Sequence, residues 1–279
     1  MFTILLPSYK RQYLRECIES VLAQTYDNWE LVIVNDASPE DLDSVVQMFE
    51  DTRIRYYKNE RNFGAERLVE QWNHCLSLAK GEYVLCIGDD DRLMPNCLET
   101  YALLIAQNPQ IRLLHGQTDI IDENGTVVRH LDRRPKWESA MSMLYHRYFS
   151  RRAQFIGDFC FRRKELLAKG GFYYLPYAWG SDDISALQVA QEHGVVNTQD
   201  VVFAYRDNAG SITRHAHVAG KIKAILLEAR WHRKFLRRPT NNPQDEYYRT
   251  QLKRHLLHHT LRKCYYTIHN AYCTNNHQQ

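Results

Sequence analysis

The feature that most constrains the fold is a regular alternation of short apolar runs and helical patterns along the first 110 residues. Apolar runs occupy residues 2–6, 30–36, 53–57 and 82–88. Segments with apolar residues at helical spacing follow at 14–24, 40–49, 65–80 and 95–107. Continuous apolar strands that alternate with helices are typical of a parallel sheet with both faces covered. The sequence therefore predicts an α/β fold, a Rossmann-like, mostly parallel sheet flanked by helices.

The alternation ends after about residue 110. Two strands are expected around the Asn124-Gly125 turn, followed by a strand at 155–163, a helix that begins at WGSDD (179–183) and a strand at 201–208. From Val218 onward the pattern is helical, with a break at 240–243. We therefore expect a catalytic domain at 1–213, with halves 1–109 and 110–213, and a C-terminal helical extension at 214–279.

The charge is distributed unevenly along the 279 residues, although the net charge is only +3. Residues 214–279 carry thirteen Lys and Arg against three acids, a net +10, while residues 1–213 are net −7. Basic residues interleaved with apolar ones suit an anionic membrane surface. A solvated face packed on the catalytic domain, or a dimer interface, explains them equally well. No nucleic-acid recognition motif accompanies them, so nucleic acid is not an expected partner.

Three further patterns predict where in the cell the protein works. Its seven cysteines form no C-x-x-C pair, which favours reduced thiols over disulfides or a zinc site. The N-terminal MFTILLPSYKRQ has no basic region before its apolar residues, so it is predicted to be a first strand and not a signal peptide. No apolar window approaches the roughly 20 residues of a membrane-spanning helix. We expect a cytoplasmic protein, or one peripheral at the inner face of the cell membrane.

A polar cluster follows each of the first four predicted strands. The clusters are Pro7-Ser8-Tyr9, Asn35-Asp36-Ala37-Ser38, Asn62-Phe63-Gly64 and Asp89-Asp90-Asp91. Ligands of open parallel sheets bind beyond the carboxyl ends of the strands, where these clusters would meet. Neither a G-x-x-x-x-G-K-[ST] nor a G-x-G-x-x-G motif occurs, which disfavours a P-loop or a dinucleotide-binding site.

The chemistry of these clusters fits a nucleotide and a metal, with simpler structural alternatives. Adjacent carboxylates such as Asp89 to Asp91 suit Mg²⁺ or Mn²⁺, whose other ligands are water and substrate phosphates. They would equally cap the helix that follows Pro95. Asp36 could accept hydrogen bonds from a base or ribose, or act as a turn residue. Tyr9 could stack on a base, or pack in the core.

Taken together, Pro7-Ser8-Tyr9, ELVIVNDAS, Asn62-Phe63-Gly64, WNHCLSLAKGEYVLCIGDDD and WGSDD resemble a family-two glycosyltransferase of the GT-A fold over about residues 1–210. The resemblance implies inverting transfer of a sugar from a nucleoside-diphosphate sugar to an acceptor hydroxyl. It also implies Mn²⁺ or Mg²⁺, which neutralises the departing diphosphate, and a carboxylate that takes the acceptor's proton.

By position, the resemblance assigns roles to the strand-end residues. The predicted nucleotide-binding residues are Pro7, Ser8, Tyr9, Asp36, Asn62, Gly64 and Asp89, with Asp36 recognising the base. Asp90 is the expected metal ligand, with Asp91 beside it. Gly88 stands where the family more often has an acid, and the family's arginine after the third strand is absent, with Arg67 or Asn73 as replacements.

The resemblance places the catalytic base in WGSDD. Asp183 matches the family's base and Asp182 is next to it; the alternative is a pair of helix-capping acids. Weaker assignments to the acceptor or sugar are Trp179, Arg206 and His215. Core packing is the alternative for Trp179, and a surface position for His215.

The predicted function is therefore a metal-dependent glycosyltransferase of hexosyl or N-acetylhexosaminyl type. Its donor is expected to be a UDP-sugar, and its acceptor a glycan or lipid-linked sugar in surface polysaccharide or glycolipid biosynthesis. The alternative is a non-catalytic nucleotide-sugar-binding or assembly subunit with the same fold. A sugar nucleotidyltransferase is disfavoured because LLPSYKRQYL contains no glycine.

Overall fold

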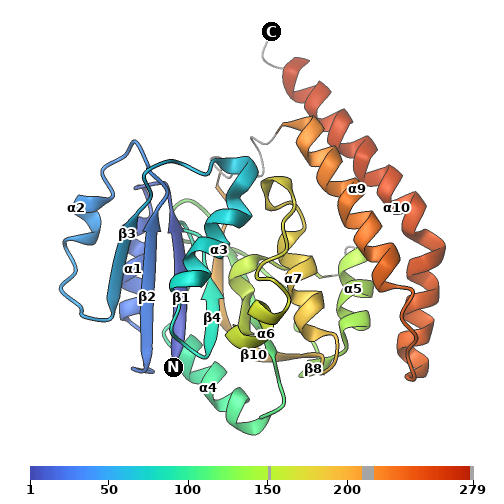
Figure 1. Cartoon of the computed structure of the whole chain (residues 1–279), viewed down its shortest axis with the longest axis horizontal. Helices are drawn as coiled ribbons and strands as arrows, with labels where there is room; N and C mark the ends of the chain where they lie inside the picture. The colour runs from blue at the N-terminus through green and yellow to red at the C-terminus, as the bar shows by residue number, and fades with distance from the viewer. Residues whose placement is uncertain (150–151, 209–216, 277–279) are drawn as a thin grey trace.

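A computed structural model describes residues 1–149, 152–208 and 217–276 (Figure 1). Its centre is a mixed sheet with the strand order β3-β2-β1-β4-β9-β6-β10-β5, to which β7 and β8 add at β6 and β10. The strands are β1 (Phe2–Ser8), β2 (Trp29–Asn35), β3 (Ile54–Lys58), β4 (Tyr83–Cys86), β5 (Arg92–Leu93), β6 (Leu113–Ile121), β7 (Val127–His130), β8 (Trp137–Glu138), β9 (Phe159–Arg162) and β10 (Val195–Arg206).

The N-terminal half of the sheet is parallel, as the alternation predicts. β1 pairs in parallel with β2 and β4, and β2 with β3. β9 then lies antiparallel between β4 and β6, and β6 pairs in parallel with β10. The predicted α/β, mostly parallel GT-A-like architecture is confirmed.

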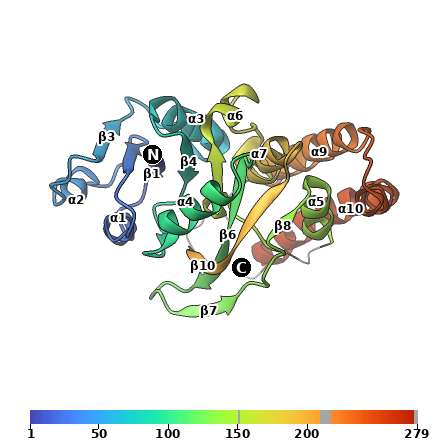
Figure 2. The same cartoon turned by 90° about the horizontal axis from the view of Figure 1, so that it is seen from below.

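Helices cover both faces of the sheet (Figure 2). One face packs against α1 (Leu14–Leu22), α2 (Asp43–Val46) and α4 (Cys97–Gln107). The other packs against α3 (Leu68–Leu78), α5 (Ala140–Tyr148), α6 (Arg163–Ala168) and α7 (Ser181–Ala190). Three short 3-10 turns, η1 (Ala65–Arg67), η2 (Ile156–Asp158) and η3 (Pro176–Ala178), complete this part of the chain.

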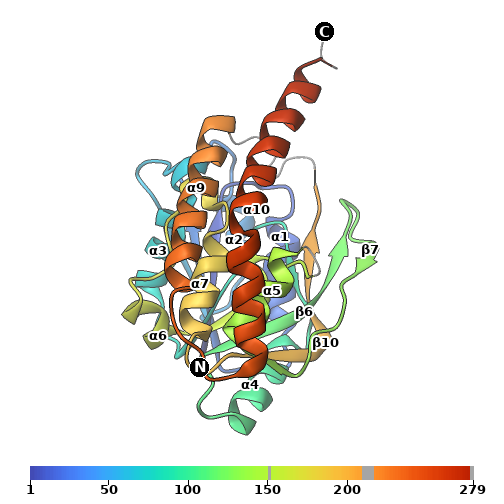
Figure 3. The same ribbon diagram turned by 90° about the vertical axis from the view of Figure 1, so that its right-hand side faces the viewer.

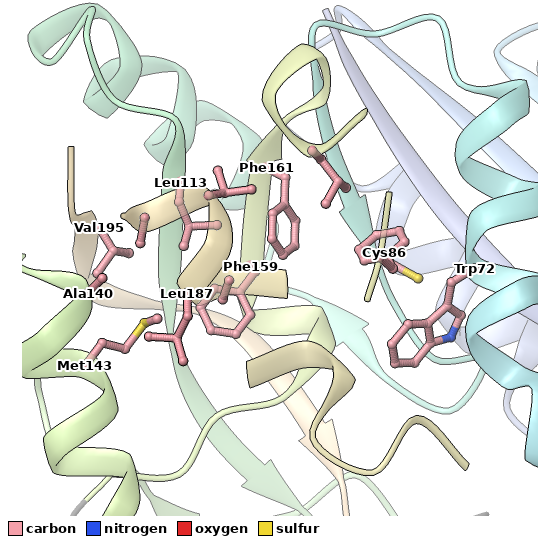
Figure 4. Close-up of a cluster of buried hydrophobic side chains, with 14 of the residues drawn as sticks. Trp72, Cys86, Leu113, Ala140, Met143, Phe159, Phe161, Leu187 and Val195 are labelled. Carbon is pink, nitrogen blue, oxygen red and sulfur yellow. The ribbon is translucent and has the colours of Figure 1, made fainter. Parts of the chain in front are cut away.

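The strands β1, β2, β4 and β9 are largely apolar because each contributes alternate side chains to two hydrophobic clusters. In β1, Leu5 belongs to the cluster under α3 and α7, while Ile4 and Leu6 belong to the cluster under α1 and α4. Figure 4 shows part of the first cluster, in which Trp72 and Phe161 are labelled. Burying each such side chain contributes roughly 1.5–3 kcal/mol, so this two-sided core holds the strand ends in place.

The C-terminal helices α9 (Val218–Phe235) and α10 (Pro243–Asn276) pack beside each other against the body (Figure 3). Tyr248 of α10 stacks on Tyr145 of α5 with ring centroids 4.4 Å apart. Leu252 and Leu256 of α10 join the same hydrophobic cluster as α5 and α7. The extension thus shares a core with residues 1–213, and the domain boundary at 213/214 stays a prediction.

The later strands differ in length from those expected. The strand expected at 155–163 begins only at Phe159, because residues 156–158 form the turn η2, where the Asp158 carboxylate accepts a hydrogen bond from the Phe155 N–H at 2.6 Å. The strand expected at 201–208 starts six residues earlier, and its register with β6 shifts between Asn197 and Phe203. Within the described part of the chain, no helix combines the length and apolar character needed to cross a membrane.

Candidate functional site

The carboxyl ends of the four parallel strands lie side by side, which brings the polar clusters to one edge of the sheet. Ser8 at the end of β1 is in register with Asn35 of β2, and Asn35 with Lys58 of β3. β4 ends at Cys86, whose neighbour in β1 is Leu5. The loops that carry Asp36, Phe63 and the three acids therefore start from adjacent positions.

Asp36 is buried at the end of β2 and organises the loop after β3. Its carboxylate accepts hydrogen bonds from the Asn59 side chain at 2.8 Å and from the Phe63 N–H at 3.0 Å. Within that loop, the Asn62 side chain accepts a short hydrogen bond from the N–H of Gly64, which has a left-handed φ of 78°. A left-handed φ suits glycine, so the predicted nucleotide residues Asn62 and Gly64 shape the backbone beside Asp36.

Asp89 joins the end of β4 to the end of β1. Its carboxylate accepts hydrogen bonds from the backbone N–H groups of Tyr9 at 2.7 Å and Lys10 at 2.8 Å. Burial, and then the neighbouring charge of Asp90, raise the pKa of Asp89 to about 6. The Tyr9 side chain is 40% exposed and free to stack, while the Ser8 hydroxyl donates inward to the Leu6 carbonyl at 3.2 Å.

The other two acids of the cluster are tied to β10 and the residues after it. Asn208 donates to the Asp90 carboxylate at 2.6 Å, and the Arg206 N–H donates to Asp91 at 3.0 Å. Asp91 also accepts a hydrogen bond from the Gly88 N–H at 3.3 Å. Burial and the adjacent Asp90 raise the pKa of Asp91 well above its usual range.

This arrangement fits a divalent cation held jointly by protein and substrate. No group of three or more His, Cys, Asp or Glu side chains among the described residues is arranged as a metal cage. Both carboxylate oxygens of Asp91 already accept backbone hydrogen bonds, whereas Asp90 accepts one from a side chain. Mg²⁺ and Mn²⁺ are commonly held by one or two carboxylates plus substrate phosphates, so Asp90 alone could hold the ion against a bound diphosphate.

The structure also explains why a glycine stands at position 88. A Cβ atom added there would lie 2.7 Å from one Asp90 oxygen and 3.0 Å from one Asp91 oxygen. Because these side chains are held by other hydrogen bonds, a larger residue would displace them. The glycine at position 88, where the family more often has an acid, leaves room for the Asp90 and Asp91 carboxylates to pack closely in this turn.

Arg206 is placed as a brace for the acid cluster and is only 1% exposed. Its guanidinium donates to the Asp90 carbonyl at 2.8 Å, to the Asp122 carbonyl at 2.9 Å and to Glu16 at 2.8 Å. It also lies 4.2 Å from the centre of the Tyr13 ring. All of these contacts are within the protein, and its predicted role toward an acceptor or sugar stays a prediction.

The second acid pair, Asp182 and Asp183, sits in the first turn of α7 after Gly180, which has a left-handed φ of 86°. Asp183 accepts hydrogen bonds from Arg147 at 3.0 Å and from Gln154 at 2.6 Å. Burial is the largest single influence and opposes its ionisation, but the charges of Arg147 and Lys263 and the hydrogen bonds from Arg147 and Gln154 together outweigh it, so the pKa of Asp183 is lowered. Asp183 is thus a fixed carboxylate, and its charge raises the pKa of Arg147.

Asp182 has a different environment although it is the next residue. Burial and the adjacent charge of Asp183 raise the pKa of Asp182 to about 7, against the opposing effect of Arg147. The charge of Asp182, like those of Asp90 and Asp91, also contributes to the raised pKa of the Tyr205 hydroxyl, whose main cause is burial. Tyr205 stacks on Phe155 at 3.7 Å between ring centroids. Tyr205 thus lies within electrostatic reach of Asp90 and Asp91 in one cluster and of Asp182 in the other.

A cavity of about 600 Å³ opens next to the loop that Asp36 organises. Phe63, Gly64, Arg67, Tyr174 and Tyr177 are among its lining residues. Arg67, one of the expected replacements for the missing arginine, lines this cavity and pairs with Glu70 at 2.5 Å. The other, Asn73, is committed to the backbone of Phe172, donating to its carbonyl at 3.0 Å and accepting from its N–H at 2.8 Å.

The two remaining weak predictions have different outcomes. Trp179 packs in a cluster with Leu175, Ile184 and Ala224, and Lys221 lies 5.1 Å from its ring centre. That position supports the core-packing alternative, and a contact with sugar or acceptor stays a prediction. His215 lies outside the described residues.

Several residues of the site were not found by sequence reasoning. Asn59, Arg147, Gln154 and Asn208 each donate a hydrogen bond to a predicted site carboxylate. Asn208 lies two residues after Arg206 and could have been found from that proximity. The other three are isolated polar residues in the sequence, and only the fold brings them to the acids.

Comparison with known proteins identifies relatives of the chain. Residues 3–171, more than half of the chain, match the profile of the glycosyl transferase family 2. The chain belongs to this family. The match includes the strand-end acids and ends before α7.

Curated relatives of this glycosyltransferase are similar over part of their length. A putative colanic acid biosynthesis glycosyl transferase, WcaA of Escherichia coli K12, is 40% identical over 104 residues, which are 36% of each chain. The UDP-Glc:alpha-D-GlcNAc-diphosphoundecaprenol beta-1,3-glucosyltransferase WfgD of Escherichia coli is 33% identical over 128 residues, 46% of this chain and 49% of the relative. The chain thus matches half or less of these relatives.

Solved structures confirm the fold. Staphylococcus aureus TarS 1-349 in complex with UDP-GlcNAc superposes with a TM-score of 0.72 at 17% identity, over 91% of this chain and 72% of TarS. Mannosyltransferase PcManGT from Pyrobaculum calidifontis, in complex with GDP-Man and Mn²⁺, superposes with a TM-score of 0.60 at 18% identity, over 98% of this chain and 75% of that one.

Proposed function

We propose that this protein is an inverting, metal-dependent glycosyltransferase that moves a sugar from a UDP-sugar to an acceptor hydroxyl in the assembly of a surface polysaccharide or glycolipid. The observation that carries the proposal is that the buried Tyr205 hydroxyl feels the charge of acids from both clusters, Asp90 and Asp91 after β4 and Asp182 in α7. Relatives named for polysaccharide assembly and a TarS complex with UDP-GlcNAc support the choice of donor and pathway class.

In this proposal the strand-end residues bind the nucleotide. Asp36 and the exposed Tyr9 ring receive the base and ribose, and Asp90 holds Mn²⁺ or Mg²⁺. The ion, when bound, supplies positive charge to the diphosphate that leaves. PcManGT, which is similar in fold, has a structure in complex with GDP-Man and Mn²⁺. That complex supports the use of a metal, and experiment must decide between a uridine and a guanosine nucleotide.

A carboxylate of the Asp182–Asp183 pair takes the proton from the attacking hydroxyl. A general base works best when its pKa is close to the working pH and it is not already committed to an ion pair. By that criterion Asp182, with a pKa of about 7, is favoured over Asp183, which Arg147 and Gln154 hold. The family resemblance favours Asp183, so the two assignments predict different variants to be inactive.

The exposed face of α10 supports a membrane-associated acceptor. Leu257, Leu261, Tyr265 and Ile268 are each at least half exposed, and all lie on one face of the helix. Arg254 and Arg262 are exposed beside them. We propose that this stripe lies on an anionic membrane, where apolar side chains insert between headgroups and the arginines attract anionic lipids.

Vesicle sedimentation tests that surface. A Leu257→Glu, Leu261→Glu double variant should lose binding to vesicles containing phosphatidylglycerol, while Val127→Glu, a change at an exposed valine of β7, should keep it. Equal binding by both would remove the membrane assignment. Point variants are preferable to removing residues 214–279, because Leu252 and Leu256 would leave the core with them.

Calorimetric titration with UDP and GDP, each with and without Mn²⁺, tests the donor site directly. We expect Mn²⁺-dependent binding of UDP that weakens at least tenfold in Asp90→Ala. Binding without any sugar transfer or donor hydrolysis would favour a nucleotide-sugar-binding subunit. Failure of both nucleotides to bind under all conditions would reject the donor site.

A further inference from the structure

A second cavity, of about 260 Å³, lies between β6, the β7 hairpin and the chain around residue 152. It is distinct from the cavity beside Phe63, and shares no lining residue with it. Its charged and titratable lining residues are Arg129, Arg134, Arg152, His115, His130 and Asp132. Three guanidinium groups against one lining carboxylate make the cavity, as far as the structure describes it, a place for an anion.

Arg134 is the central observation, because it is a buried cation with an uncommitted donor. The residue is 4% exposed, and its Nη2 donates to the Ala153 carbonyl at 2.8 Å and to Gln154 at 3.1 Å. Its Nη1 has no hydrogen-bond partner among the described residues and lies 3.6 Å from Glu138 Oε1. A buried donor without a partner is costly, and an anion that reached this group would remove that cost.

Glu138 does not neutralise this group alone. It forms a short ion pair with Arg152 as well, so one carboxylate serves two guanidinium groups. Burial lowers the pKa of Arg134 to about 10; Glu138 and Asp158 oppose that effect, while the charges of Arg152 and Arg147 add to it. The surroundings therefore leave part of the positive charge uncompensated.

The rest of the lining completes an anion-binding surface. Arg129 is exposed at the rim, and its guanidinium makes no hydrogen bond or ion pair with any residue that the structure describes. Neither ring nitrogen of the buried His115 makes a hydrogen bond to a described residue; Nε2 lies 3.5 Å from Asp158, and burial lowers the pKa of this imidazole. Guanidinium forks match phosphate oxygens in pairs, and three of them can surround one phosphate.

The cavity is connected to the acid pair at the start of α7. The Gln154 side chain accepts a hydrogen bond from Arg134 and donates one to Asp183 at 2.6 Å. One amide thus links the Arg134 guanidinium to the acid pair. None of the predicted nucleotide or metal residues lines this cavity, so the diphosphate of a donor bound at the strand ends does not account for it.

From this geometry we propose that the cavity binds a phosphate or diphosphate group of the acceptor, attached close to the sugar whose hydroxyl is attacked. The proposal rests on the proposed glycosyl transfer and names the acceptor class for the same site. A volume of about 260 Å³ exceeds a single structural water, which takes up roughly 30 Å³, and leaves room for a phosphate with part of its sugar.

The first test is calorimetric titration of inorganic pyrophosphate into the full chain saturated with UDP and Mn²⁺, so that the donor site is filled. We expect one pyrophosphate site, weakened roughly 10-fold or more in Arg129→Gln and lost in Arg134→Gln, since hydrogen bonds to charged groups contribute about 1.5–3 kcal/mol each. Arg133→Gln is the matched control, because Arg133 is an exposed neighbour that does not line the cavity.

If Arg134→Gln fails to fold, as far-UV circular dichroism would show, Arg129→Gln and Arg133→Gln still decide the question. Pyrophosphate affinity that is equal in wild type, Arg129→Gln and Arg133→Gln overturns the site, and so does an absence of pyrophosphate binding in the wild type. Failure of UDP to bind in the same titrations would count against the proposed function instead, and pyrophosphate is then titrated without UDP.

The second test compares acceptors. N-acetylglucosamine with a diphosphate on a short lipid, a phosphate-bearing glycan, and a neutral alkyl N-acetylglucosaminide are assayed with UDP-sugars. We expect a phosphate-bearing acceptor to be preferred over the neutral one, and the preference to fall at least 10-fold in Arg129→Gln but not in Arg133→Gln. Which phosphate-bearing acceptor is used separates the lipid from the glycan. Equal use of neutral and phosphorylated acceptors, in wild type and variant alike, contradicts the proposal.

Discussion

The acid cluster after β4 and the acid pair at the start of α7 are both runs of adjacent aspartates, yet the fold gives them different chemistry. Asp89 and Asp91 bind backbone N–H groups and hold loops together, which leaves Asp90 for a ligand. In the α7 pair, one carboxylate is fixed by Arg147 while its neighbour has a pKa near 7. Neighbours that differ in this way are typical of acid–base sites, because the environment separates their pKa values.

The largest expected effect separates the two members of the α7 pair. Asp182→Asn should lower kcat by about 10²–10⁴-fold with little change in UDP affinity, because general base catalysis contributes that much. Asp183→Asn should lower both kcat and thermal stability, because it leaves Arg147 without its carboxylate. Steady-state kinetics and thermal unfolding on both variants check this. A fully active Asp182→Asn variant would move the base to Asp183.

The second-largest effect is expected at Arg206, which braces the acid cluster after β4. Its replacement should lower the free energy of unfolding. Arg206→Met removes a buried guanidinium from Glu16 and from three carbonyls, and we expect a loss of about 2–3 kcal/mol, discounted because Glu16 is partly exposed. Urea unfolding measures it. Arg15→Met is the control, since Arg15 pairs with Glu19 at an exposed position and should change stability by less than about 0.5 kcal/mol. An equal loss in both would show that Arg206 is no brace.

The pH dependence of the reaction gives a smaller but sharper distinction. A base must be deprotonated to act, so a base with the raised pKa of Asp182 predicts that kcat/KM falls about tenfold per pH unit below pH 7. The lowered pKa of Asp183 predicts a flat profile between pH 6 and 8. The profile should be measured in wild type and in Asp183→Asn; a flat wild-type curve assigns the base to Asp183.

The smallest expected effect is the contribution of the Asp182 carboxyl to the stability of the folded protein. Its pKa rises from about 3.8 when unfolded to about 7 when folded, so the folded state loses stability as pH rises through that range. Asp182→Asn removes this loss and should raise the Tm at pH 8 by a few degrees, with the gain fading toward pH 4. Differential scanning calorimetry at the two pH values checks the sign. A lower Tm at pH 8 would show that the ionised carboxylate stabilises the fold.

The N-terminal half could be predicted well because local pattern and global fold agree there. Each apolar run became a parallel strand, and Asp36, Asp89 and Asp90 lie at the predicted edge. The later strands were less predictable because β9 and β10 depend on long-range pairing with β4 and β6, which leaves no periodic signal.

The partners of the site acids were beyond prediction for a related reason. Arg147 and Gln154 contact Asp183 only because the fold packs α5 and the chain before η2 against α7. Asp182 and Asp183 are chemically identical in the sequence, and their pKa values differ because the fold brings Arg147, Lys263 and Gln154 to Asp183. The sequence did not mark Arg134 as a site residue, because nothing in the pattern around it distinguishes a buried arginine from the many exposed ones.

The brace at Arg206 has a consequence for how the protein is made. One side chain contacts residues 16, 90 and 122, which precede it by up to 190 positions. Chains are synthesised from the N-terminus and domains generally fold as units. The parallel half of the sheet emerges from the ribosome with its acid turn unsupported until β10 follows. Nascent chains shorter than about 208 residues should therefore be unable to hold a sugar nucleotide, which delays activity until the whole sheet is assembled.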